Sequence, residues 1–88
     1  MIRKRVVLSG EVQGVNFRET CRSVATKNGL GGWVRNLRDG RVEAVFEGPV
    51  DRVDRVVTWA HDGPRGAVVD DIAVHVEHPE GLTRFVIK

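Results

Sequence analysis

The sequence is poor in cysteine and lacks long apolar runs, and both shortages exclude whole classes of protein. Cys21 is the only cysteine among the 88 residues, so an intrachain disulfide and a metal site built from several thiolates are both excluded. No stretch approaches the ~18 apolar residues of a membrane-spanning helix, and the apolar run after the basic start is too short for a signal peptide. We therefore expect a cytoplasmic protein that does not associate with membranes.

Length and charge narrow the class further. A chain of 88 residues is too short for a second hydrophobic core, so we expect one domain, residues 1–88. Such a domain buries only about 60% of the surface that its unfolded chain exposes, which predicts a site built from surface loops. The net charge of +2 suits an anionic small molecule or a polyanion and does not distinguish between them.

Residue periodicity predicts five strands and two helices. Runs rich in β-branched or alternating apolar residues predict strands over 2–10, 32–37, 41–47, 72–77 and 84–88. Apolar residues at helical spacing predict one helix from Phe17 to about residue 28 and another whose stripe covers residues 53–60. Asn16 and Glu19 have the spacing of a capping box at the start of the first helix.

This order of elements is typical of a ferredoxin-like βαββαβ sandwich, an α+β fold. We expect an antiparallel sheet with two helices on one face, a short extra C-terminal strand, and a solvated second face that carries Glu43 and Glu47. In this fold the third strand runs between the first two, whose C-terminal ends therefore lie about 10 Å apart at one sheet edge. The loop after Gly10 should then be a neighbour of Asn36.

The loop over residues 11–16 leads directly into a helix, and this arrangement favours an anion. A helix start offers unpaired N–H groups at the positive end of its dipole, and Gly14 allows the backbone to curl around a ligand. Arg18 adds a planar donor fork that fits two phosphate oxygens. From the residues alone, an ordinary turn followed by an exposed arginine explains the same pattern equally well.

Two motifs resolve this ambiguity through a family resemblance. Residues 10–18, Gly-Glu-Val-Gln-Gly-Val-Asn-Phe-Arg, resemble the first signature of the acylphosphatase family, with every fixed position present. Residues 32–36, Gly-Trp-Val-Arg-Asn, followed by Gly40, Val42 and Gly48, resemble its second signature. The resemblance extends over essentially the whole chain.

The resemblance implies an enzyme that hydrolyses acyl phosphates and releases inorganic phosphate, without metal or cofactor. It implies that Asn36 orients the attacking water. It also implies that the phosphate binds to Arg18 and to the N–H groups of a loop made of Val12, Gln13, Gly14, Val15, Asn16, Phe17 and Arg18. We expect a monomer with no nucleic-acid partner.

Other candidate groups have simpler explanations. Cys21 falls on the apolar face of the first helix, where it is expected to fill the core. The three histidines have no spacing that demands a metal, and an RNA-binding module would carry aromatic residues where Glu43 and Glu47 stand. An accessory domain of a larger carbamoyl-transferring maturation protein is a further alternative, less favoured because the chain ends at Lys88.

Overall fold

Seven elements form the fold, in an order that places β3 between β1 and β2. The computed structural model describes all residues from Met1 to Lys88. The elements are β1 (Ile2–Glu11), α1 (Phe17–Lys27), β2 (Gly31–Asn36), β3 (Val42–Gly48), α2 (Val50–Asp62), β4 (Val68–Glu77) and β5 (Phe85–Ile87). The strands form one sheet in the order β4-β1-β3-β2-β5. The predicted order of elements and the predicted place of the third strand are therefore confirmed.

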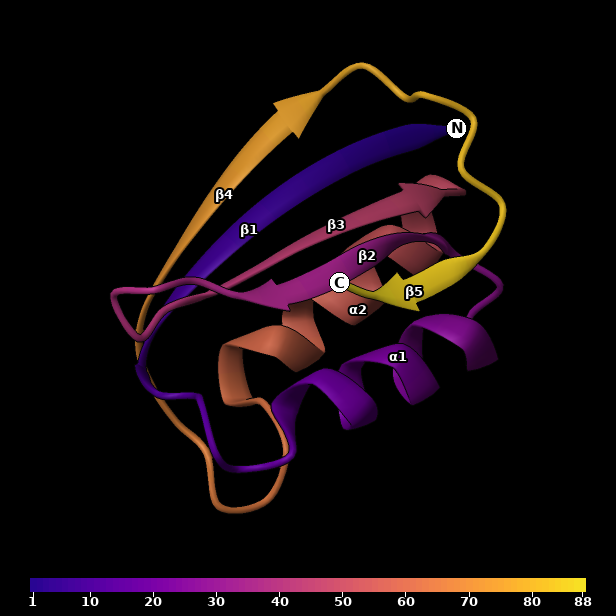
Figure 1. Cartoon of the computed structure of the whole chain (residues 1–88). Coiled ribbons are helices and arrows are strands. Elements are labelled where there is room, and N and C mark those ends of the chain that lie inside the picture. The colour runs from indigo at the N-terminus through magenta and orange to yellow at the C-terminus, as the bar shows by residue number, and fades with distance from the viewer.

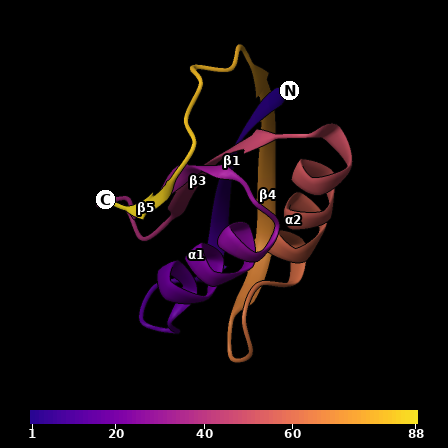
Figure 2. The ribbon, with the colours of Figure 1, turned by 90° about the vertical axis from the view of Figure 1, so that its right-hand side faces the viewer.

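Both helices lie against one face of the sheet (Figure 1). Helix α1 packs against β2 and β5, whereas α2 packs against β1, β3 and β4, and Figure 2 shows the two helices beside each other. The pairs β4–β1, β1–β3 and β3–β2 are antiparallel, whereas β5 pairs with β2 in parallel. The sheet is thus mixed, and the ferredoxin-like α+β sandwich with a short extra C-terminal strand is confirmed. Neither helix is long and apolar enough to cross a membrane.

The apolar stripes predicted for the two helices face the sheet and form the core. The buried helix residues are Phe17, Cys21 and Ala25 on α1 and Val53, Val56, Val57 and Ala60 on α2. Gly29, with a φ of 67°, adopts the left-handed conformation just after α1 that an Asn-Gly pair predicts. Helix α1 also begins at Phe17, as the sequence indicates.

Strand β4 is longer than the sequence indicates. It begins at Val68 rather than at residue 72, because Val68 and Val69 pair with Glu11 and Gly10 beyond a register shift in β1. The exposed Asp70-Asp71 pair breaks the apolar alternation that would have indicated this extension. Such polar residues are tolerated because β4 is an edge strand.

The sheet face opposite the helices is not the solvated surface that the alternation predicted. Glu43 and Glu47 are both buried, because arginine side chains from neighbouring strands lie over them. Arg5 Nη1 and Arg35 Nη2 lie 3.3 Å and 2.7 Å from carboxylate oxygens of Glu43. The expectation of a solvated face is therefore wrong. The alternation of residues shows only which side chains are polar, whereas ion pairs between strands decide whether these side chains are buried.

Glu47 organises the segment between β4 and β5. Its side chain is 3% exposed, and Arg3 Nη1 lies 2.8 Å from its Oε2 atom. The N–H groups of Glu80, Gly81 and Leu82 donate hydrogen bonds of 3.0 to 3.1 Å to the same carboxylate. Burial acts to raise the pKa of Glu47, but the hydrogen bonds from Arg3 and these N–H groups outweigh it and hold that pKa below its usual value. Ionised Glu47 therefore fixes the segment that leads into β5.

Replacing Glu47 by glutamine should destabilise the fold in a pH-dependent way. At neutral pH we expect Glu47→Gln to lower the free energy of unfolding by about 3 kcal/mol, the cost of breaking a buried ion pair. A carboxyl group whose pKa is lowered by folding contributes stability above its unfolded pKa of about 4.3 and loses it as the pH falls through the folded pKa. The gap between wild type and Glu47→Gln should therefore shrink in urea unfolding experiments below about pH 4.

The exposed Glu11 provides a matched control for this substitution. Glu11→Gln should change the free energy of unfolding by less than about 0.5 kcal/mol at any pH. A gap between wild type and Glu47→Gln that stays constant from neutral pH to about pH 2 would contradict the role assigned to the ionised carboxylate.

Candidate active site

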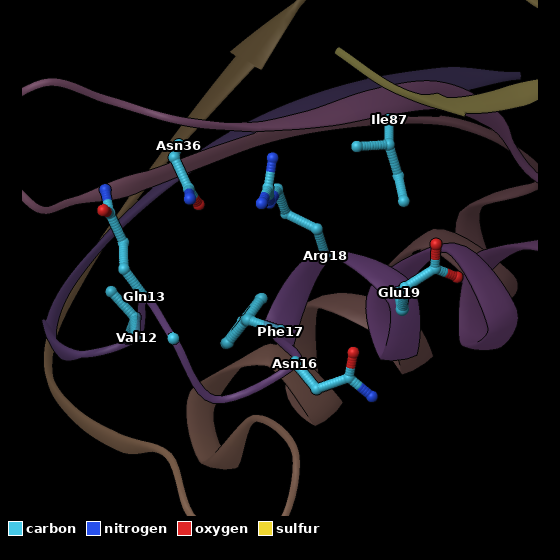
Figure 3. A pocket seen from close by; sticks show the side chains of 9 residues that line it. Val12, Gln13, Asn16, Phe17, Arg18, Glu19, Asn36 and Ile87 are labelled. Atoms are coloured by element: carbon cyan, nitrogen blue, oxygen red, sulfur yellow. The ribbon is translucent and has the colours of Figure 1, made fainter.

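A cavity opens at the sheet edge where β1 and β2 both end. Its volume is about 420 Å³, and its walls come from the β1–α1 loop (residues 12–16), the first turn of α1, the end of β2, and β5. Figure 3 shows the side chains of Gln13, Arg18 and Asn36 around this space. The loop and Asn36 are thus neighbours, as predicted, because β3 separates β1 and β2 and all three strands reach this edge.

Two buried apolar side chains fix the ends of the β1–α1 loop. Val12 is fully buried where β1 ends, and Phe17, the first residue of α1, is 2% exposed. The ring of Phe17 packs on Trp59 of α2, with 5.6 Å between the ring centroids. The loop residues between these anchors, 13–16, are therefore held at both ends by the core.

The backbone of the β1–α1 loop leaves its donors available. Gly14 has a φ of 74° and Asn16 a φ of 61°, and Asn16 is the only non-glycine residue in the left-handed region, which asparagine tolerates. No N–H group of residues 12–16 donates to a backbone carbonyl group, and the first N–H groups of α1 have no acceptor within the helix. Together with the positive end of the helix dipole, these unpaired donors favour an anion.

The capping box predicted for α1 is wrong. Asn16 is the N-cap residue, but its side chain makes no capping hydrogen bond and points away from the cavity (Figure 3). Glu19 pairs instead with Arg22, 2.8 Å away. No capping side chain therefore occupies the N–H groups at the start of α1, and they remain accessible to a ligand.

Arg18 and Asn36 approach the cavity from different elements. Arg18 lies in the first turn of α1 and is exposed, and Asn36 is the half-buried last residue of β2. In Figure 3 the guanidinium group extends toward the end of β2, and the amide of Asn36 points into the cavity. Neither side chain has a hydrogen bond or ion pair within the protein. An unpaired guanidinium beside open N–H groups suits a phosphate-like anion.

Gln13 uses its side chain differently from Arg18 and Asn36. Its Nε2 atom donates to the carbonyl oxygen of Leu37 at 2.8 Å and to that of Arg41 at 3.0 Å. Both carbonyl groups belong to the turn that joins β2 to β3. Gln13 therefore links the β1–α1 loop to the hairpin that follows Asn36.

All the predicted site residues except Val15 line the cavity, and two further residues do so. Val15 packs against the core instead, and the additional lining residues are Glu19 and Ile87. Ile87 reaches the cavity because β5 pairs with β2 in a register that places it opposite Val34. The sequence indicated the short last strand but carried no signal for the strand that it joins. Glu19 directly follows Arg18, so the predicted helix start could have placed it here.

The remaining candidate groups lie outside the cavity. Cys21 is fully buried in the core, where burial raises the pKa of its thiol to about 12, so its expected role as a core residue is confirmed. His61, His75 and His78 are exposed and do not line the cavity. The chemistry of the cavity is therefore left to a guanidinium, two carboxamides, backbone N–H groups and one carboxylate.

Comparisons with known proteins agree with this geometry. The family model of acylphosphatase matches residues 4–87. An acylphosphatase of Trichormus variabilis is 56% identical over 88 residues, which cover 100% of this chain and 87% of the relative. The chain is also similar to the crystal structure of acylphosphatase from Bacillus subtilis, with a TM-score of 0.96 at 39% identity. The match covers 100% of this chain and 99% of the Bacillus subtilis chain. The structure of T. kodakarensis HypF matches with a TM-score of 0.86 at 29% identity. That match covers 100% of this chain and 12% of the HypF chain.

Fold and relatives together define a hydrolase built on a ferredoxin-like α+β sandwich. The chain belongs to the acylphosphatase family. The resemblance carried by its two sequence motifs is therefore confirmed.

The thiol of Cys21 should be inert in the native protein. Burial that raises its pKa to about 12 leaves almost no thiolate at neutral or mildly basic pH, and the side chain is not accessible to a reagent. We expect an aromatic disulfide reagent at about pH 8 to label no thiol in the native state and one thiol per chain in a denaturant. Rapid labelling of the native protein would show that Cys21 is reachable and contradict its place in the core.

Proposed function

We propose that the chain hydrolyses the carboxyl–phosphate bond of acyl phosphates and releases a carboxylate and inorganic phosphate. The observation that carries this proposal is the convergence of an unpaired guanidinium, open N–H groups and one free carboxamide on a single cavity. Membership of the acylphosphatase family supports the substrate class. The guanidinium, the N–H groups and the carboxamide recognise the phosphate end of the substrate, so the proposal covers acyl phosphates with different acyl groups.

The phosphate binds at the start of α1 in this proposal. The N–H groups of residues 12–18 direct their partial positive charges at its oxygens, and the helix dipole adds about 0.3–1 kcal/mol. Arg18 contributes a planar fork whose hydrogen bonds to a charged group are worth roughly 1.5–3 kcal/mol each. A cation at a helix N-terminus opposes the dipole unless an anion lies between them. The placement of Arg18 is therefore unfavourable for the free helix and favourable for the complex.

Asn36 orients the attacking water at the other side of the phosphate. Its carboxamide can accept a hydrogen bond from the water and donate one to a substrate oxygen at the same time. The water attacks phosphorus, a phosphate oxygen of the substrate takes its proton, and the carboxylate leaves with the electron pair of the broken bond. A carboxylate is a good leaving group, so positioning and charge stabilisation replace a strong base.

We also propose that the protein is a single-domain monomer that acts in the cytoplasm. It is proposed to have no nucleic-acid partner. The arginines on the open face of the sheet are engaged by glutamates, through the pairs Arg3–Glu47, Arg3–Glu77, Arg5–Glu43, Arg5–Glu77 and Arg35–Glu43. These pairs leave that face with few free cations for a polyanion, whereas Arg18 has no such partner.

Alanine substitutions should separate phosphate binding from turnover. Arg18→Ala should weaken the binding of inorganic phosphate by at least about tenfold and raise KM for acetyl phosphate, because hydrogen bonds to a charged group are lost. Asn36→Ala should lower kcat by about 100-fold and leave phosphate affinity within about twofold, because only the water loses its orientation. Competitive inhibition by phosphate and steady-state hydrolysis of acetyl phosphate measure both quantities.

Arg55→Ala provides the control for charge, since Arg55 is exposed on α2 and does not line the cavity. It removes the same charge as Arg18→Ala and should leave both phosphate affinity and kcat unchanged. Equal losses of phosphate affinity in Arg18→Ala and Asn36→Ala would contradict the division of roles proposed here.

A chelator should not affect the reaction. The proposed mechanism draws its charge stabilisation from Arg18 and backbone N–H groups, so no step depends on a metal ion. We expect the same kcat for acetyl phosphate in buffer treated with EDTA and in buffer containing Mg²⁺, both corrected for spontaneous hydrolysis. Loss of activity in EDTA that Mg²⁺ restores would refute the metal-free mechanism.

A further inference from the structure

We propose that Gln13 is a positioning residue that sets the place of Asn36 relative to the phosphate. This inference rests on the proposed function and adds a role that the catalytic groups do not supply for themselves. Gln13 lies in the loop that would bind phosphate, but its amide nitrogen is directed to Leu37 and Arg41. An amide NH₂ group has two hydrogens, so these two bonds use all its donors.

The two bonds from Gln13 lie at the end of the β2–β3 hairpin where the strands meet the turn. Asn36 and Val42 form the last register pair of the two strands, and the N–H group of Leu37 donates to the carbonyl oxygen of Arg41 at 2.8 Å. Gln13 donates to the carbonyl oxygens of Leu37 and Arg41, the two residues that follow and precede this register pair along the chain. The contact therefore acts on the residue directly after Asn36 along the chain.

No other hydrogen bond joins the β1–α1 loop to this hairpin. Strand β3 lies between β1 and β2, so no backbone ladder connects the loop directly to the strand that carries Asn36. The turn itself, Arg38-Asp39-Gly40, is exposed, and its hydrogen bonds join it only to Leu37 and Arg41. Gln13 is thus the direct connection between the phosphate-binding side of the cavity and the water-orienting side.

The fold does not depend on this connection. Without Gln13, the Leu37 carbonyl oxygen still accepts from the N–H group of Gly40, and that of Arg41 still accepts from Leu37. Neither oxygen is left without a partner, so a variant that lacks the donor should fold. Gln13 itself is only half-buried. Loss of the donor should therefore allow the hairpin to shift while the loop, anchored by Val12 and Phe17, keeps its shape.

The test is a double-mutant cycle between Gln13→Met and Asn36→Ala, with acetyl phosphate as substrate. Methionine keeps the length of the side chain and removes its donors. We expect Gln13→Met to lower kcat by about 10- to 100-fold, because a small misplacement of a positioning group has effects of this size. Inhibition by inorganic phosphate should change by no more than about twofold, which also shows that the variant is folded. In the Asn36→Ala background, Gln13→Met should cause no further loss of kcat.

Thr20→Val is the matched control. The hydroxyl of Thr20 donates to the carbonyl oxygen of Asn16 at 2.9 Å, so this variant removes another side-chain hydrogen bond of the same loop. Thr20 does not line the cavity and makes no hydrogen bond to the hairpin turn, and its N–H group keeps a bond to the same oxygen. Thr20→Val should therefore keep the kcat of wild type.

The outcomes separate this inference from the function on which it rests. Wild type that does not hydrolyse acetyl phosphate refutes the proposed function and this inference with it. If wild type is active and Asn36→Ala is impaired, an unchanged kcat in Gln13→Met refutes the inference alone. It is also refuted if Gln13→Met lowers kcat by the same factor in both backgrounds, or if phosphate affinity falls in parallel with kcat.

Discussion

The site depends on one topological constraint, the insertion of β3 between the parallel strands β1 and β2. Neighbouring strands lie about 4.8 Å apart, so the ends of β1 and β2 are separated by about 10 Å. A small anion held by the loop after β1 can then also reach the residue that ends β2. Adjacent strands would leave no space for a ligand between their ends. A further intervening strand would carry Asn36 beyond the reach of anything bound at the helix start.

The arginines on the open face of the sheet have carboxylate partners, whereas Arg18 at the cavity has none. Arg3 and Arg5 each contact two or more carboxylates, and Arg35 pairs with Glu43. These ion pairs cover the open face of the sheet and bury side chains that would otherwise be solvated. Arg18 has no carboxylate partner and lies at the helix end where a cation is least stable. Other arginines, Arg55 among them, also lack a carboxylate partner, so Arg18 is distinguished by its place at the cavity and at the helix start, where an incoming anion is favoured.

Local patterns predicted the elements and most of the cavity lining, and they failed where contacts between distant residues decide the outcome. The stripe on α2 and the loop before α1 are encoded by spacing within a few residues, so both could be predicted. The burial of Glu43 and the parallel pairing of β5 depend on partners that are remote in sequence. The capping box failed for another reason: Asn16 has the right identity and spacing, but its left-handed backbone is incompatible with that bond.

The two glycines that begin β2 show how close packing constrains the strand that carries Asn36. A Cβ atom at Gly32 would collide with the carbonyl oxygen of Val45, and one at Gly31 with that of Leu82. Both glycines therefore permit close approach of β2 to its neighbours. The segment containing Leu82 is held by ionised Glu47, and it leads to β5, whose Ile87 forms one wall of the cavity. The two sides of the cavity thus have different supports: the β1–α1 loop relies on buried apolar anchors, whereas β5 relies in part on a buried charge.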